Sequence, residues 1–238
     1  MIIDPQQLGA PALYKILIGT VLPRPIGWVS TVSAAGVPNL APFSFFTVVA
    51  RKPPMVSLTI QPRADLATPK DTLANMRETG EFAVHIVSLA QVNEMHLNAV
   101  DHPADVDEFA VTGLERQPCD LIRPPRVAGA PVAMECRVKR IVGLGEVGDH
   151  VVIGEVLRFH VRDDLWHPNG RVDTAAIQPV GRLAAEYTVV DTTFACPAPA
   201  ELVAGRAGSR MRRLDGRDAG WAAVDDKHWS ASGNARID

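Results

Sequence analysis

The side chains best suited to binding a ligand are concentrated in residues 22–60. Arg24 stands between two prolines, and Trp28, Ser30 and Thr31 follow it closely. Alternation along a strand places Trp28 and Ser30 on one face and Thr31 on the other. A strand that only fills a core does not need hydroxyls on both faces, and an arginine suits bidentate contact with a phosphate. The segment is therefore predicted to form part of a binding site, with an interface salt bridge as the alternative role for Arg24.

A second candidate group lies at the start of a helix predicted over residues 68–80. Thr68 is the expected N-cap, a proline follows it, and a glycine ends the helix. Lys70 opposes the helix dipole there, whereas a bound phosphate would reverse that effect with help from the Thr72 hydroxyl. A site for a small anion is predicted. The alternative is that Lys70 is a solvated surface residue and Asp71 only a cap.

Alternating apolar residues predict a series of strands around these groups. The expected strands cover residues 29–33, 39–48, 54–60, 81–87, 132–138, 151–161 and 183–190. A second helix should open at a capping box formed by Ser88 and Gln91 and fade by Asp101. Residues 101–131 are expected to form a long connection that wraps a partner subunit or covers a site. Many strands with two short helices predict a mainly β (α+β) fold, an antiparallel barrel with its helices segregated.

Composition and charge limit the class of protein. The 238 residues carry a formal net charge of -3 and are 47% hydrophobic, which fits one large domain or a domain with an extension. No basic stripe is present, so nucleic acid is not an expected partner. The sequence shows neither a signal peptide nor an apolar run of membrane-spanning length, so we expect no membrane association and a cytoplasmic location.

The potential metal ligands do not form a recognised pattern. Three widely spaced cysteines without a C-x-x-C pair argue against a disulfide framework and a zinc site, and small buried apolar roles are expected for them: Cys119, Cys136 and Cys196. A loose group of histidines and acids spans a helix end and a loop, where a solvated loop is the expected reading: His96, Asp101, His102 and Asp105. No metal site is predicted.

The composition shifts towards Ala, Gly, Arg and Asp from Cys196 onward. Residues 196–238 are therefore expected to form a C-terminal tail. A packed extension, anchored by Trp221 and Trp229, is the alternative.

Three blocks stand out by their order and spacing: PRPIGWVST at 23–31, NLAPFSFF at 39–46 and KDTLAN at 70–75. Together they resemble the flavin reductase-like family with the FMN-binding split-barrel fold. Later blocks, PVAMEC at 131–136, GDH at 148–150 and VGR at 180–182, extend the resemblance over roughly residues 8–192. The implied domain is 1–195. No G-x-G-x-x-G motif follows a strand, which disfavours a Rossmann dehydrogenase.

The resemblance implies an FMN cofactor, with FAD as the alternative flavin. The implied cofactor-binding residues are Arg24, Trp28, Ser30, Thr31, Asn39, Ala41, Phe43, Ser44, Phe45, Lys70, Asp71, Thr72, Asn75, Arg182 and Tyr187. Some of the aromatic residues are expected to pack in the core. His150 is the implied catalytic candidate, near flavin and nicotinamide, and a structural turn histidine is the alternative.

The resemblance also implies a homodimeric reductase that passes a hydride from NAD(P)H to flavin N5. A monooxygenase or another flavin-accepting protein is the implied partner. Two alternatives remain open: a flavoprotein electron carrier with tightly bound FMN, and a flavin-binding protein without enzymatic activity.

Overall fold

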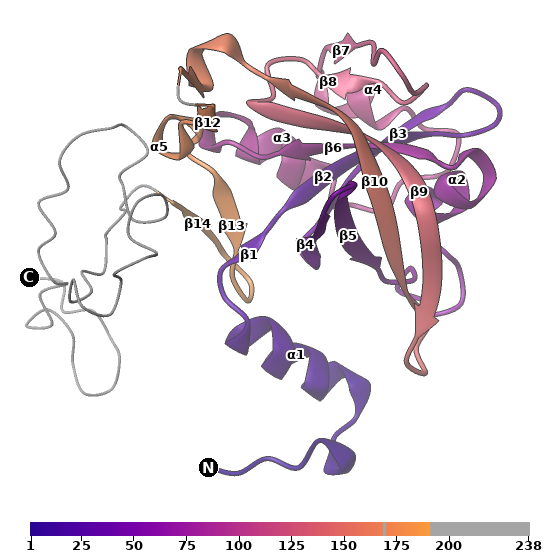
Figure 1. Cartoon of the computed structure of the whole chain (residues 1–238). Coiled ribbons are helices and arrows are strands. Elements are labelled where there is room, and N and C mark those ends of the chain that lie inside the picture. The colour runs from indigo at the N-terminus through magenta and orange to yellow at the C-terminus, as the bar shows by residue number, and fades with distance from the viewer. Residues whose placement is uncertain (169, 191–238) are drawn as a thin grey trace, which may run out of the picture.

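The computed structural model describes residues 1–168 and 170–190, shown in colour in Figure 1. The predicted tail at 196–238, with Cys196, Trp221 and Trp229, lies outside the described residues.

A seven-stranded antiparallel sheet forms the body of the molecule, in the order β3-β2-β6-β9-β10-β5-β4. Its strands are β2 (Gly27–Val32), β3 (Pro38–Phe43), β4 (Phe46–Arg51), β5 (Pro54–Ile60), β6 (Glu81–Ile86), β9 (Val132–Leu144) and β10 (Asp149–Val161). The edge strands β3 and β4 are consecutive in the chain, separated only by residues 44 and 45. The sheet must therefore curl until its two edges approach each other at this seam. The predicted antiparallel, mainly β architecture is confirmed.

Short strands and helices surround this sheet. One small sheet has the order β1-β13-β14, and two further pairs stand alone. These strands are β1 (Arg24–Pro25), β7 (Arg116–Gln117), β8 (Arg126–Val127), β11 (Trp166–His167), β12 (Arg171–Val172), β13 (Val180–Arg182) and β14 (Tyr187–Val189). The α-helices are α1 (Ala10–Thr20), α2 (Asp71–Thr79), α3 (Val92–Leu97), α4 (Glu108–Thr112) and α5 (Thr174–Ile177), and single 3-10 turns cover Pro5–Gln7, Leu89–Gln91 and Asp163–Leu165.

Both faces of the central strand β2 are buried. Val29 belongs to one apolar cluster together with Phe82, whereas Trp28 belongs to a second cluster on the other face. Packing in the first cluster depends on Gly154 in β10, because a Cβ at this position would lie 2.2 Å from Cζ of Phe82. The sheet thus has a packed interior on one side and a second packed layer on the other.

The strand predicted over 39–48 is divided in the structure. It ends at Phe43 and resumes at Phe46, so Ser44 and Phe45 form the corner between the two sheet edges. The strand predicted over 183–190 was also wrong in its extent, since Tyr187–Val189 pairs with Val180–Arg182 in a separate hairpin. Alternation of apolar residues signals a strand but does not reveal where the strand leaves its sheet.

The predicted start of the first helix was wrong. Lys70 is the N-cap of α2, in an extended conformation. Thr68 is engaged elsewhere, because its Oγ1 and backbone N–H both donate to the carboxylate of Asp65. The end at Gly80 is confirmed, with a left-handed backbone that favours glycine.

The predicted capping box of the second helix is not formed. Ser88 makes no side-chain cap and instead bridges Pro179, while Nε2 of Gln91 donates to the carbonyl of Ala128 at 3.0 Å. Contacts with distant segments have replaced the local pair here.

Candidate functional site

A cavity with two connected lobes lies at the seam between β3 and β4. The wide lobe has a volume of about 220 Å³, and the narrow lobe about 30 Å³. Residues common to both lobes are Pro42, Phe43, Lys70 and Ala99. The corner of the sheet and the start of α2 therefore form a shared wall between them.

The wide lobe is lined by six of the predicted flavin-site residues: Phe43, Ser44, Phe45, Arg182, Tyr187 and Lys70. The first three come from the seam, the next two from the β13–β14 hairpin, and Lys70 from the start of α2. Helix α1, which the sequence did not predict and which projects from the barrel in Figure 1, adds Tyr14, whose ring centroid lies 6.4 Å from that of Phe45. Aromatic rings and polar groups therefore line the same lobe.

Tyr187 is held in place by two neighbours. The Arg182 guanidinium carbon lies 4.6 Å from the centroid of the Tyr187 ring, in a cation–π contact. On α3, Nδ1 of His96 is 2.9 Å from the Tyr187 hydroxyl, and the two rings meet edge to face. His96 was not predicted as a site residue, because 91 positions separate it from Tyr187 and no spacing signal connects them.

The narrow lobe contains the start of α2. Lys70, Asp71 and Thr72 line it together with Asn39 and Ala41, all of them predicted site residues. The Asn39 amide donates to the Thr72 hydroxyl at 3.1 Å, so β3 and α2 are joined directly. This lobe therefore combines a helix N-terminus with an ammonium group and a buried hydroxyl.

The cations of the narrow lobe are paired with acids. Nζ of Lys70 lies 2.5 Å from Asp101, and the Arg63 guanidinium lies 2.5 Å from Asp71. Arg63 also donates to the carbonyl of His102 at 3.1 Å. An anion that binds here must compete with Asp101 for the ammonium group.

Two polar atoms at the narrow lobe lack a partner among the described residues. These are Oδ1 of Asn98, a residue only 1% exposed, and Nε2 of His102. The Asn98 amide nitrogen already donates to the carbonyl of Glu108, which fixes the orientation of the amide. Buried polar atoms without partners are costly, so this lobe is chemically suited to polar groups of a ligand or to water rather than to an apolar ligand.

A buried carboxyl group completes the narrow lobe. Glu108 is 6% exposed and accepts a hydrogen bond from the backbone N–H of Leu40 at 2.5 Å. Burial raises the pKa of Glu108 to about 7 against the opposing effect of that hydrogen bond. The charge of the lobe therefore changes near neutral pH.

Five charged or polar residues of the narrow lobe were not predicted as site residues: Arg63, Asn98, Asp101, His102 and Glu108. They lie in the loop before α2 and in the segment from the end of α3 to the start of α4. Only the folding of this segment against β3 and α2 brings them together.

The hydroxyls on both faces of β2 stabilise the frame of the site. Ser30 donates to the carbonyl of Pro125 at 2.6 Å, and Thr31 accepts a hydrogen bond from Asn75 at 3.0 Å. Trp28 is fully buried in its apolar cluster. Neither lobe is lined by these four side chains. A flavin contact for each of them stays a prediction.

Arg24 lies behind the wide lobe, is 5% exposed and does not line the cavity. Its guanidinium donates to the carbonyls of Ile18 and Val21 at the end of α1 and to the carbonyl of Leu183, at 2.6, 3.1 and 2.7 Å. Its Nε is 3.4 Å from Oγ of Ser44. Arg24 thus joins α1, the β13–β14 hairpin and the seam.

His85 in β6 was not predicted as a site residue, although it supports strand β2. The backbone N–H of Val127 donates to its Nε2 at 3.1 Å, so Nδ1 carries the hydrogen and donates to the carbonyl of Trp28 at 2.8 Å. Complete burial lowers the pKa of His85 to about 4. His85 is therefore a neutral, buried hydrogen-bonding residue at neutral pH.

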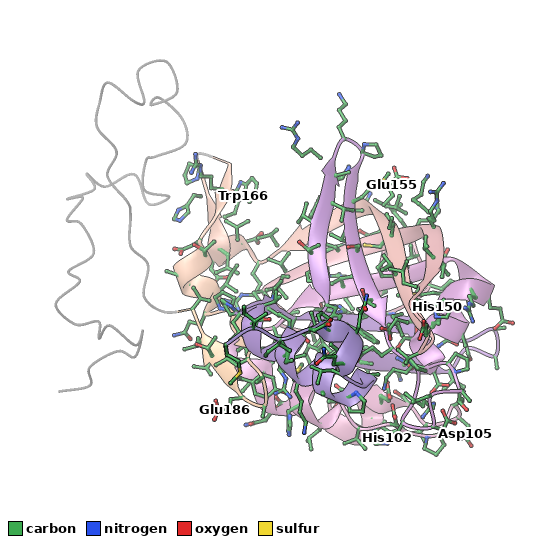
Figure 2. All side chains as sticks on the ribbon, turned by 90° about the horizontal axis from the view of Figure 1, so that it is seen from below. His102, Asp105, His150, Glu155, Trp166 and Glu186 are labelled. Atoms are coloured by element: carbon green, nitrogen blue, oxygen red, sulfur yellow. The ribbon has the colours of Figure 1, made fainter. Side chains whose placement is uncertain are left out.

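His150 does not line either lobe. Its Nε2 accepts a hydrogen bond from Arg77 and its Nδ1 donates to the carbonyl of Gly148, both at 2.8 Å. Figure 2 shows His150 and Glu186, the neighbour of Tyr187, on opposite sides of the molecule. A catalytic role of His150 stays a prediction.

Within the described residues, one group has the types and proximity of metal ligands: Asp120, Glu135 and His160. The Glu135 carboxylate already accepts hydrogen bonds from the backbone N–H groups of Asp120 and Leu121 and lies 2.5 Å from Nε2 of His160. This geometry anchors the loop before Leu121. His96 and Asp101, from the loose group seen in the sequence, have separate partners in Tyr187 and Lys70.

The chain matches the model of the flavin reductase like domain over residues 18–176. This chain belongs to the flavin reductase-like family. Its membership confirms the resemblance, identifies the curled sheet as a split barrel, and places the protein among flavin-related oxidoreductases. In the part of the chain that the structure describes, every helix is too short or too polar to cross a membrane.

Individual relatives of this flavin reductase-like protein support the same assignment. An uncharacterized protein of Halalkalibacterium halodurans is 37% identical over 204 residues, covering 84% of this chain and 97% of the relative. Nitrilotriacetate monooxygenase component B from Bacillus cereus is 34% identical, with a TM-score of 0.78 over 82% of this chain and 97% of its own. The 2-nitrobenzoate 2-nitroreductase NbaA of Pseudomonas fluorescens is 27% identical, with a TM-score of 0.75 over 84% and 96%.

Proposed function

We propose that the protein is an NAD(P)H-dependent flavin reductase that binds FMN in the two-lobed cavity. The observation that carries this proposal is the junction of the lobes at Phe43 and Lys70. An aromatic, partly polar space adjoins a small space with a cation and a helix N-terminus. FMN has the same arrangement, with a flat ring at one end and a phosphate at the other.

The residues of each lobe have defined roles in this proposal. Lys70, Thr72 and the free N–H groups at the start of α2 bind the phosphate. Phe43, Phe45 and Tyr187 contact the ring, and Ser44 and the remaining Arg182 N–H groups supply polar contacts. The small volume of the narrow lobe favours FMN over FAD, which needs room for a second nucleotide.

Bound flavin would supply the redox chemistry by accepting a hydride from the reduced nicotinamide, and the protein would supply orientation and exclusion of water. The buried groups behind the cavity fit the second role. Arg24 holds Ser44 in position, and Asn75 and Thr31 hold α2 against β2. These residues position the lining residues in this proposal.

We further propose that the protein acts in the cytoplasm as a homodimer formed by its barrel domain, residues 1–195. Two apolar surfaces support the dimer. Helix α1 has no buried residue and exposes Leu17, and β4 exposes Val48 and Val49 at the sheet edge. The likeness to a monooxygenase component B supports a monooxygenase or another flavin-accepting protein as the partner. Light scattering of the purified chain checks the dimer.

An anaerobic titration of the purified protein tests the enzymatic proposal. FMN, FAD and riboflavin are added in parallel, and flavin absorbance is followed with NADH and with NADPH. We expect binding of FMN ahead of FAD and bleaching at the flavin band with at least one nicotinamide. Tight FMN binding without nicotinamide oxidation would instead favour the electron carrier. A purified protein that shows no binding of FMN would overturn both the reductase and the electron-carrier proposals.

A further inference from the structure

His96 and Tyr187 link the wide lobe to solvent. Tyr187 lines the lobe, and its hydroxyl is 2.9 Å from Nδ1 of His96. His96 is exposed, so its imidazole ring can take up protons from water. Two titratable side chains thus connect the cavity wall with the surface through one hydrogen bond.

The geometry of this pair is fixed by its neighbours. The rings of His96 and Tyr187 are 5.7 Å apart at their centroids and inclined by 87°. Arg182 covers the tyrosine ring and donates to the carbonyls of Ala185 and Glu186 at 3.1 and 3.4 Å. The tyrosine hydroxyl is therefore held at one position rather than free to turn into solvent.

We propose that His96 and Tyr187 form a proton relay that delivers solvent protons to the wide lobe during flavin-dependent reduction. The inference rests on the proposed function. Reduction of a flavin by a reduced nicotinamide transfers a hydride, which carries both electrons, and also consumes one proton. The hydride comes from the nicotinamide, and the relay supplies the proton.

The relay returns to its starting state after each proton. In neutral His96, Nδ1 accepts a hydrogen bond from the Tyr187 hydroxyl. A solvent proton binds Nδ1 when the hydrogen bond between His96 and Tyr187 opens to water, because Nε2 already carries a hydrogen. In the resulting imidazolium Nδ1–H donates to Oη, and the hydroxyl hydrogen is free to face the lobe. As this hydrogen leaves Oη for the flavin that has accepted the hydride, the proton on Nδ1 moves to Oη and His96 is again neutral.

The surroundings distinguish His96 from His150. Both ring nitrogens of His150 are occupied, by Arg77 and by the carbonyl of Gly148. The charged groups that face the relay are Arg182, over the tyrosine ring, and Lys70, which lines the same lobe and is paired with Asp101. The described lining of the wide lobe contains no carboxylic acid and no histidine; its other side chains able to donate a proton include the Tyr14 hydroxyl and the Lys70 ammonium, which is paired with Asp101.

Two variants and one control test the relay. Tyr187→Phe keeps the ring and its contact with Arg182 but removes the hydroxyl. His96→Asn keeps a hydrogen-bonding group near the position of Nδ1 but cannot carry a proton. His167→Asn is the matched control, since His167 pairs with Asp173 at 3.4 Å, lines neither lobe and has no proposed role in catalysis or binding.

The first measurement uses the protein without flavin. Long-range proton–nitrogen NMR of the His96 ring should show a hydrogen-bonded Nδ1 without a proton in the neutral state, and Tyr187→Phe should abolish that signal. The second measurement is the dissociation constant of FMN, which should change less than about threefold in each variant. A His96 ring that carries its proton on Nδ1 at high pH, or one that does not respond to Tyr187→Phe, would overturn the relay.

The third measurement is the pH profile of anaerobic flavin reduction in single turnovers. General acid catalysis contributes about 100-fold or more, so the rate of flavin reduction should fall at least about tenfold in each relay variant. The part of the pH profile that depends on His96 should also disappear. The double variant should be no slower than either single variant, and His167→Asn should resemble the wild type. Unchanged profiles, or losses that multiply in the double variant, would refute the relay while leaving the reductase intact. Failure of the wild type to bind or reduce flavin would overturn the proposed function, and the relay with it.

Discussion

Replacement of Lys70 by alanine should weaken FMN binding without affecting riboflavin, which has the same ring but no phosphate. In the structure Lys70 lines both lobes and is the N-cap residue of α2, and its ammonium group makes no cap hydrogen bond. Alanine removes the ammonium and leaves the free N–H groups of the helix and the partly engaged Arg63. The effect should therefore be a partial loss of phosphate binding.

Two opposing contributions set the magnitude. A hydrogen bond from a charged group to phosphate is worth about 1.5–3 kcal/mol. Before the phosphate binds, Lys70 must leave Asp101, and this partly exposed ion pair is worth roughly 0.2–1 kcal/mol. The difference is about 1–2 kcal/mol, which corresponds to a dissociation constant about 5- to 30-fold larger for FMN.

Quenching of flavin fluorescence gives both dissociation constants under the same conditions. Lys139→Ala is the matched control, because Lys139 is also in an ion pair, with Glu155 at 2.9 Å, but lines neither lobe. An equal loss for FMN and riboflavin, or a change of less than about twofold for FMN, would refute the assignment of the phosphate to this lysine.

Three further predictions concern competition, pH and packing. Asp101→Asn should tighten FMN binding by up to about fivefold, because the phosphate no longer competes for the ammonium, and weaker binding in the same titration would contradict this. The pKa of His85 is about 4 in the folded protein and about 6.5 in the unfolded chain, so the unfolded chain binds more protons between these pH values. The free energy of unfolding should therefore fall by up to about 3 kcal/mol as the pH falls through this window. Urea unfolding at pH 7 and pH 5 should show about 2 kcal/mol of this loss in the wild type and less in His85→Gln, and identical pH dependence of the two proteins would refute it. Gly154→Ala should lower the free energy of unfolding by about 1–3 kcal/mol, because the new Cβ forces the Phe82 ring to move. Gly19→Ala is the control and should not destabilise the protein, since no atom lies within 4 Å of a Cβ at that position. Equal unfolding midpoints for the two variants would contradict the packing argument.

Local signals predicted the elements more reliably than their ends. The β-branched and aromatic run before Phe46 indicated a strand, but the break at Ser44 depends on where the opposite edge of the sheet arrives. The Thr68 side chain suited an N-cap, yet Asp65 binds it first. The break at Ser44 therefore depends on a segment distant in the sequence, whereas Thr68 is taken by a local competitor three residues before it.

The candidate site shows the same division. Types and order of residues, with the family resemblance, placed Phe43 and Lys70 in a common site, and the cavity contains both. The hydroxyls of β2 were also noticed, but their burial against Pro125 and Asn75 gives them a role in the frame. Composition alone cannot distinguish a side chain that faces a cavity from one that faces a neighbouring loop.

The sequence by itself determined the antiparallel barrel, the flavin-related chemistry and the helix that ends at Gly80. These properties depend on residue types at short spacing, which alternation, helix caps and family motifs record. Only the tertiary structure decided that His96 meets Tyr187, that Asn98 and Glu108 close the narrow lobe, and that His150 lies apart from both lobes. These contacts join segments tens of residues apart, and their geometry depends on how the sheet curls and how the loops pack over its seam.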